Sequence, residues 1–67
     1  MSGVYKKINL VGTSTDSYEE AIATAINRAE QTLNDLEWFE VEEFRGGISA
    51  DGDLEYQAVI RAAFKLK

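Results

Sequence analysis

The sequence predicts an α+β fold of order β-α-β-β, in which a three-stranded antiparallel sheet packs on one helix. Three observations predict it. β-branched and aromatic residues are concentrated in a first segment, residues 4–11. Apolar residues at spacings of three and four follow, as in an amphipathic helix. The last third alternates apolar and polar residues on both sides of Asp51-Gly52, a strong hairpin signal.

The first strand is expected over Val4–Val11, followed by turn and cap residues. Ser17 and Glu20 form a capping box, in which each side chain accepts a hydrogen bond from a backbone N–H at the helix start. We therefore expect a helix to begin at Tyr18. Its apolar stripe consists of Ile22, Ala25, Ile26, Ala29, Leu33 and Leu36.

The helical period gives way to a period of two in the middle of the chain. We expect the helix to end near Asn34 or Asp35, because both residues tolerate helix-ending conformations. The period of two begins at Glu37 and returns over Leu54–Leu66. These two stretches are expected to pair as a long hairpin that the helix covers on one face.

The register of this hairpin follows if Asp51-Gly52 are its two loop residues. Numbers of paired residues then sum to 103, which places Phe39 opposite Phe64 on the core face. On the other face, Trp38 lies opposite Lys65. A bulge at the Gly46-Gly47 pair would shift the register by one residue.

The chain is short, and residues 1–67 are expected to form a single domain. A core of this size rarely supplies more than about 3–5 kcal/mol of stability. The sequence contains no Cys and no His, which excludes disulfides and a conventional zinc site. Self-association is the remaining way to stabilise so small a fold, so we expect an oligomer.

The charge balance narrows the partners. Seven Lys and Arg against twelve Asp and Glu give a net charge of −5, which disfavours nucleic-acid binding. No apolar run approaches the roughly 18 residues that a membrane span needs. The start of the chain does not resemble a secretory signal, so we expect a cytoplasmic protein with no membrane partner.

Catalytic residues are scarce. Without His and Cys, the commonest general base and the best nucleophile are missing, and we predict no enzyme. Thr13 and Ser14 are interpreted as turn and cap residues rather than as an anion site before the helix. Glu40 and Glu42 are candidates for chelating a hard cation, although carboxylates on strands more often form a solvated face.

Trp38, the only tryptophan, is predicted to lie on the strand face opposite Phe39, away from the helix. One interpretation is an interface anchor, because Trp is enriched at interface hot spots. The other is a stacking surface for a planar ligand. The residues alone leave both interpretations open, and the two are compatible.

The chain as a whole resembles the dodecin family, over Val4–Leu66. The resemblance is carried by Val11-Gly12-Thr13-Ser14, Arg28-Ala29, Gln31-Thr32-Leu33, Leu36-Glu37-Trp38-Phe39-Glu40-Val41, Arg45-Gly46, Tyr56-Gln57 and Phe64-Lys65-Leu66. It implies that the protomer assembles into a hollow homododecamer. It also implies non-covalent flavin storage or sequestration without turnover.

The resemblance also assigns flavin contacts. It implies that Trp38 stacks on the isoalloxazine, with flavins held between two symmetry-related tryptophans, and that Gln57 hydrogen-bonds the polar edge of the ring. Arg45 matches bacterial members that favour FMN over the riboflavin or lumichrome of archaeal members. Lys65 replaces an arginine that meets the FMN phosphate, which keeps the charge but loses the bidentate geometry. Glu37 is a candidate neighbour of the ring.

Further ligands and rival functions remain open. The resemblance suggests coenzyme A, with Lys6 and Arg28 as candidate contacts. One rival is an oligomeric assembly module without a ligand. Another is a hard-cation-binding oligomer, in which Glu40 or Glu42 meets its copies across a symmetry axis.

The predicted pairing has one consequence for a shared ligand. Trp38 is expected opposite Lys65, which lies eight residues, or about 27 Å of extended strand, from Gln57. One isoalloxazine spans no such distance. If Trp38 and Gln57 hold the same flavin, different subunits must therefore supply them.

Overall fold

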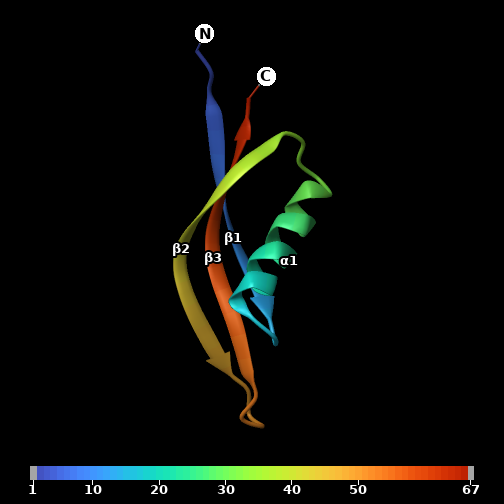
Figure 1. Ribbon diagram of the computed structural model, residues 1–67, viewed down its shortest axis with the longest axis vertical. Helices are drawn as coiled ribbons and strands as arrows, with labels where there is room; N and C mark the ends of the chain where they lie inside the picture. Colours follow the sequence, from blue (N-terminus) through green and yellow to red (C-terminus); the bar gives the residue numbers. More distant parts are fainter. Residues whose placement is uncertain (1, 67) are drawn as a thin grey trace.

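The computed structural model describes residues 2–66, which form the predicted β-α-β-β order (Figure 1). The elements are β1 (Tyr5–Ser14), α1 (Tyr18–Glu30), β2 (Leu36–Ile48) and β3 (Leu54–Lys65). The three strands form one antiparallel sheet with the order β1-β3-β2, so the last strand is the central one. The predicted fold class is confirmed at the level of the protomer.

The first strand is longer than predicted. It continues to Ser14 instead of ending at Val11, because Gly12, Thr13 and Ser14 still pair with β3. The first half of the stretch interpreted as turn and cap residues (12–17) is therefore sheet. The helix begins at Tyr18, as predicted, behind the N-cap Ser17, whose Oγ accepts a hydrogen bond from the backbone N–H of the third helical residue at 3.0 Å.

The helix is shorter than predicted and ends at Glu30, not near position 34 or 35. The backbone N–H groups of Thr32 and Leu33 both donate to the carbonyl of Ala29, at 3.2 and 2.9 Å, and this tightens the chain into a turn. Asp35 then adopts a left-handed conformation, with φ of 64°, and the chain enters β2. The predicted apolar stripe therefore extends beyond the helix that it identified.

The hairpin loop is longer than the two residues predicted. Ile48 pairs with Leu54, so the loop contains five residues. It is closed by the Ser49 N–H, which donates to the carbonyl of Asp53 at 2.9 Å, and by the Asp53 N–H, which donates to the Ser49 hydroxyl at 3.1 Å. Gly52 supplies the positive φ, 87°, that this turn requires.

The predicted register is also wrong. The longer loop shifts it by one residue, since Ile48 pairs with Leu54, and the bulges between Val41 and Glu43 and between Leu36 and Trp38 each shift it by one more. The glycine pair, where a bulge was expected, is regular. Each bulge inserts an extra residue into β2 without changing β3. The loop and the bulge between Val41 and Glu43 together place Phe39 opposite Ala62, not Phe64, and Trp38 opposite Ala63, not Lys65.

The core is built from small residues at the contact between α1 and the sheet. Ala21, Ala25, Ala58 and Ile60 form the buried cluster. A Cβ atom at Gly12 would lie 2.0 Å from the Ala21 carbonyl oxygen, so only glycine permits this close approach of helix and strand.

The helix covers less of the hairpin than predicted. It packs mainly on β1 and β3, whereas β2 bows away from it (Figure 1). Phe39, Val41 and Phe44 point to the helix side of the sheet but remain 46%, 38% and 55% exposed. The protomer therefore leaves apolar side chains uncovered on both faces of β2.

The protomer is elongated. Its extents are 53 × 21 × 15 Å and its radius of gyration is 13.8 Å, against about 11 Å for a compact domain of this length. Its accessible surface is 4908 Å², whereas a typical monomer of this mass exposes about 4,200 Å². The excess surface is what a subunit of a larger assembly presents. Within residues 2–66, no helix is long and apolar enough to cross a membrane.

Candidate functional site

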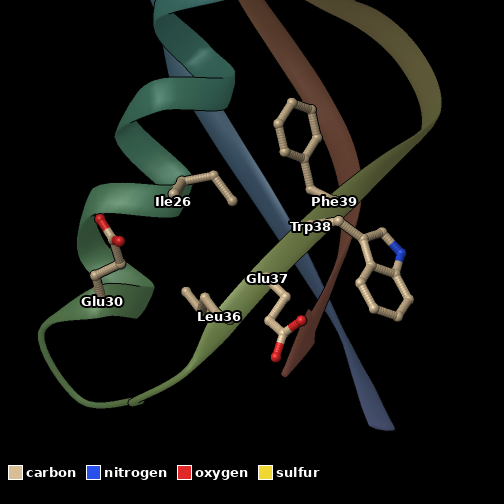
Figure 2. A pocket seen from close by; sticks show the side chains of 6 residues that line it. All are labelled: Ile26, Glu30, Leu36, Glu37, Trp38 and Phe39. Atoms are coloured by element: carbon tan, nitrogen blue, oxygen red, sulfur yellow. The ribbon is translucent and has the colours of Figure 1, made fainter. Parts of the chain in front are cut away.

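The outer face of the sheet, defined as the face turned away from α1, carries most of the predicted site residues. On β3 it presents alternate residues from Gln57 to Lys65, whereas the buried residues between them face α1. Trp38 of β2 and Lys7 of β1 pair with Ala63 from either side, so the three form one row across the sheet. Figure 2 shows the indole on the side of β2 opposite Phe39, which points toward α1. The predicted orientation of Trp38 is confirmed.

The indole of Trp38 is 40% exposed but has polar and aromatic neighbours. Its Nε1–H donates to Glu40 Oε2 at 3.0 Å, and Lys7 Nζ donates to the same oxygen at 2.8 Å. The ring of Tyr5 lies 5.0 Å from it, centroid to centroid, with an interplanar angle of 58°. The hydrogen bond from Lys7, and then that from Trp38, lowers the pKa of Glu40 below its ordinary value of 4.5.

Gln57 lies at the other end of the outer face, in a second polar network. Arg45 is its pairing partner on β2 and donates from Nε to Gln57 Oε1 at 2.9 Å. The Gln57 amide nitrogen donates to Glu55 Oε1 at 2.9 Å. The side-chain amide is therefore oriented from both sides, by a cation at its oxygen and a carboxylate at its nitrogen.

The predicted flavin residues thus form two groups at opposite ends of one protomer. Trp38 lies opposite Ala63, which is six residues, or about 20 Å of strand, from Gln57. Lys65 lies two residues beyond Ala63, opposite Tyr5, and so belongs to the Trp38 end. The corrected register shortens the predicted separation but leaves it too long for one three-ring ligand.

Glu37 is the extra residue of the first β2 bulge and lies next to the indole in sequence. It lines a hollow of about 110 Å³ between the end of α1 and the start of β2 (Figure 2). The other lining residues are Ile26, Glu30, Leu36, Trp38 and Phe39. Small-molecule pockets usually measure about 300–1,000 Å³, so this hollow alone does not accommodate a flavin.

Lys6 and Arg28, the candidate coenzyme A contacts, lie off the outer face. Lys6 pairs with Phe64 and points to the helix side of β1, and Arg28 lies exposed in the last turn of α1. Neither residue lies in the row of Trp38 or in the network of Gln57.

Sequence reasoning missed Tyr5, which packs on Trp38, and Lys7, which shares Glu40 Oε2 with the indole, and it assigned Glu40 another role. The spacing of two between Trp38 and Glu40 placed both on one face, which was a usable signal. The sum of 103 also predicts Glu42 opposite Arg61. The two side chains form an ion pair at 2.8 Å, although Glu42 is the extra residue of the second bulge and the pairing partner of Arg61 is Glu40. Within residues 2–66, no group of three or more potential metal ligands is present in the protomer.

Comparisons with known proteins agree with this fold. The Dodecin family profile matches residues 4–67. A dodecin from Thermus thermophilus is 51% identical over 67 residues, which is 100% of this chain and 97% of that protein. The crystal structure of a T. thermophilus protein aligns with a TM-score of 0.90 at 50% identity, covering 98% of this chain and 97% of the other.

Two more distant proteins share the fold. The dodecin structure from Streptomyces davaonensis has a TM-score of 0.91 at 37% identity, covering 100% of this chain and 98% of that one. A protein named calcium dodecin, from Mycobacterium tuberculosis, is 33% identical over 64 residues, which cover 96% of this chain and 90% of the relative. The profile match and these identities over nearly the whole length show that the chain belongs to the dodecin family.

Proposed function

We propose that the chain binds a flavin non-covalently, stacked between Trp38 side chains of neighbouring copies in a hollow dodecamer, and that it stores or sequesters the flavin. The observation that carries the proposal is the only tryptophan of a dodecin-family chain, 40% exposed on a sheet face that the protomer does not cover. Aromatic rings in offset stacking suit a planar isoalloxazine. The sequence contains neither His nor Cys, and we propose no turnover.

The proposed site is shared between subunits. Trp38 and Gln57 are separated by about 20 Å of strand within one protomer, so one flavin contacts both only if different copies supply them. The exposed apolar residues of β2 support the same conclusion, because they require a covering partner. We therefore expect flavin affinity to depend on assembly.

Stacking explains why storage protects the ligand. An electron-rich indole in contact with an excited flavin quenches it by electron transfer, which limits photochemical damage. FMN is the proposed ligand over riboflavin and lumichrome, because Arg45 and Lys65 are cations suited to its phosphate. Glu37, beside the indole, is proposed as a neighbour of the ring.

A fluorescence titration of purified protein with FMN, riboflavin and lumichrome tests the proposal. We expect saturable quenching by wild type and a loss of most binding in Trp38→Ala, with fluorescence restored for any flavin that remains bound. Lys65→Met should weaken FMN binding and leave riboflavin unchanged. Full-strength binding by a verified monomeric variant would contradict the shared site, and colourless protein that takes up no flavin would favour a ligand-free assembly module.

A hard-cation site is the second candidate, favoured by the name of the calcium dodecin relative. Because residues 2–66 of one protomer hold no cluster of three ligands, such a site needs carboxylates from several copies. Glu40 and Glu42 are the proposed donors, and each already forms an ion pair within the protomer. Calorimetric titration with calcium distinguishes this function, because it should give heat in wild type and none in Glu42→Gln.

Coenzyme A remains a prediction. Lys6 and Arg28 are the cations proposed to meet its phosphates, from the helix side of the protomer rather than from the outer face. Calorimetric titration of wild type and of Arg28→Met with coenzyme A tests it. Equal heats in the two proteins would contradict the assignment of Arg28.

A further inference from the structure

Trp38 is held from several sides by other side chains of the outer face. The indole N–H donates to Glu40 Oε2 at 3.0 Å, and the ammonium of Lys7 holds that same oxygen at 2.8 Å. The ring of Tyr5 packs at 5.0 Å in a tilted arrangement. The hydrogen bond thus fixes the position of the indole N–H, and the contact with Tyr5 fixes the tilt of the ring, although 40% of the residue is exposed.

The chain of contacts crosses the whole sheet. Glu40 and Lys7 belong to the two edge strands, β2 and β1, with β3 between them. The residue beneath the crossing is Ala63, which is 0% exposed and pairs with Lys7 on one side and Trp38 on the other. A small side chain at this position lets the long side chains of both edge strands meet above the central one.

The neighbouring guanidinium of Arg61 does not compete with Trp38 and Lys7 for Glu40 Oε2. Arg61 on β3 is the pairing partner of Glu40, but its guanidinium Nε is engaged by Glu42 at 2.8 Å and by Asn9 at 3.3 Å. Among the hydrogen bonds of residues 2–66, Glu40 Oε2 therefore accepts only two, from the indole N–H and from the Lys7 ammonium. Two ion pairs of similar length lie side by side on the outer face, and only one of them touches the tryptophan.

We propose that Lys7 and Glu40 are positioning residues for flavin binding, which fix the indole of Trp38 in its stacking orientation before the ligand arrives. The inference rests on the proposed function. A side chain that must be ordered during binding costs affinity, and a preorganised one avoids that cost. The pair needs no contact with the flavin, because it acts through the ring that it holds.

Four variants separate this role from a general effect of surface charge. Lys7→Met removes the ammonium and keeps the length of the side chain, and Glu40→Leu removes both hydrogen bonds. Lys7→Arg restores a cation and should rescue. Arg61→Met is the matched control, because it removes the adjacent ion pair without touching Trp38.

The FMN dissociation constant should rise about 2- to 12-fold in Lys7→Met and more in Glu40→Leu, the range expected for ordering one side chain. Lys7→Arg should stay within about 2-fold of wild type because it keeps the cation, and Arg61→Met should do so because Arg61 does not hold the indole. Size-exclusion chromatography shows which variants assemble as wild type does. Should Glu40→Leu not assemble, Lys7→Met and its Lys7→Arg rescue carry the test.

The flavin-free protein provides a readout that a merely structural role would not change. Trp38 is the only tryptophan, so its ultraviolet resonance Raman bands report the indole N–H hydrogen bond, and its fluorescence anisotropy reports ring mobility. Glu40→Leu should lose the hydrogen-bond signature, and Lys7→Met should lower the anisotropy. Wild type that takes up no FMN overturns the proposed function, whereas unchanged indole spectra in both variants overturn this inference. Unchanged FMN affinity in a Lys7→Met protein with a loosened indole also overturns it.

Discussion

Gly12 is the position where a single added methyl group should do most damage to the protomer. An alanine Cβ there would lie 2.0 Å from the Ala21 carbonyl oxygen and 2.9 Å from the Ala25 Cβ. Ordinary contacts begin at about 3.4 Å, so α1 would have to retreat by roughly 1.4 Å. The obstacle is helix backbone, which has no alternative rotamer.

The size of the stability loss follows from the core residues that such a displacement of α1 would expose. Ala21 and Ala25 are 0% and 7% exposed, and both belong to the small cluster that joins α1 to the sheet. Overpacking a core costs about 1–3 kcal/mol and occasionally more, and a backbone clash belongs at the upper end. We therefore expect Gly12→Ala to lose about 3 kcal/mol, against the roughly 3–5 kcal/mol that a core of this size supplies. For a domain of this length, that corresponds to a fall in Tm of about 12–24 °C.

Thermal unfolding followed by circular dichroism measures the effect, at one fixed protein concentration because assembly makes Tm concentration-dependent. Gly46→Ala is the matched control. It adds the same methyl group to a strand, where the nearest atom, the Glu55 carbonyl oxygen, lies at an ordinary 3.5 Å. Its Tm should stay within a few degrees of wild type. Equal Tm values for Gly12→Ala and Gly46→Ala would refute the packing argument.

Three further predictions concern the helix cap, the proposed ligand and pH. Ser17→Ala removes the N-cap hydroxyl and should cost about 1 kcal/mol in thermal unfolding, whereas Ser17→Gly should cost only a few tenths. Gln57→Ala should weaken FMN binding by about 1–3 kcal/mol in a quenching titration, because a polar edge of the ring loses its partner, and undiminished affinity would contradict that contact. Glu40 has a lowered pKa when folded, chiefly through Lys7, so its contribution to stability is present above its ordinary pKa of 4.5 and is lost as pH falls through the lower folded value. Acid unfolding curves of wild type and Glu40→Gln should therefore converge at low pH, and curves that stay parallel below pH 4.5 would count against this linkage.

Elements whose signals are local could be predicted from the sequence. The capping serine fixed the start of α1, because one hydroxyl and one backbone N–H decide it. The face of Trp38 was also predictable, because adjacent strand residues point to opposite sides whatever the register. The order β-α-β-β followed from the residue types of the first strand, the hydrophobic periods and the Asp51-Gly52 turn signal.

Structural features that depend on tertiary contacts could not be predicted from the sequence. The apolar stripe continues through Leu33 and Leu36, so its periodicity predicted a helix that continues beyond Glu30. The helix ends there because the next backbone N–H groups form a turn by donating to the Ala29 carbonyl. The two bulges of β2 leave no mark in the pattern of a strand that is apolar at both Trp38 and Phe39. Together with the longer loop, they made the predicted register wrong by one residue next to the loop and by two residues at Trp38.

The partners of Trp38 show why the site was harder to predict than the fold. The contact of Lys7 with Glu40 exists only because β3 enters between β1 and β2, and nothing local to residue 7 indicates this strand order. Arg45 and Gln57, by contrast, belong to consecutive strands, and the predicted pairing missed their contact by one residue. Predictability thus fell with the number of strands that a contact crosses.

We expect the curvature of β2 to couple flavin binding to assembly. Because the strand bows away from α1 (Figure 1), it exposes Phe39 and Phe44 on the helix side while presenting Trp38 on the outer face. We expect a neighbouring copy to cover the apolar side and thereby to fix the path of β2, and with it the position of the indole. Phe44→Asp, which places a charge on the apolar side without touching the outer face, should therefore lower flavin affinity in proportion to the assembly it disrupts. Sedimentation and flavin titration over the same range of protein concentration test this coupling. Undiminished flavin binding by dissociated subunits would contradict it.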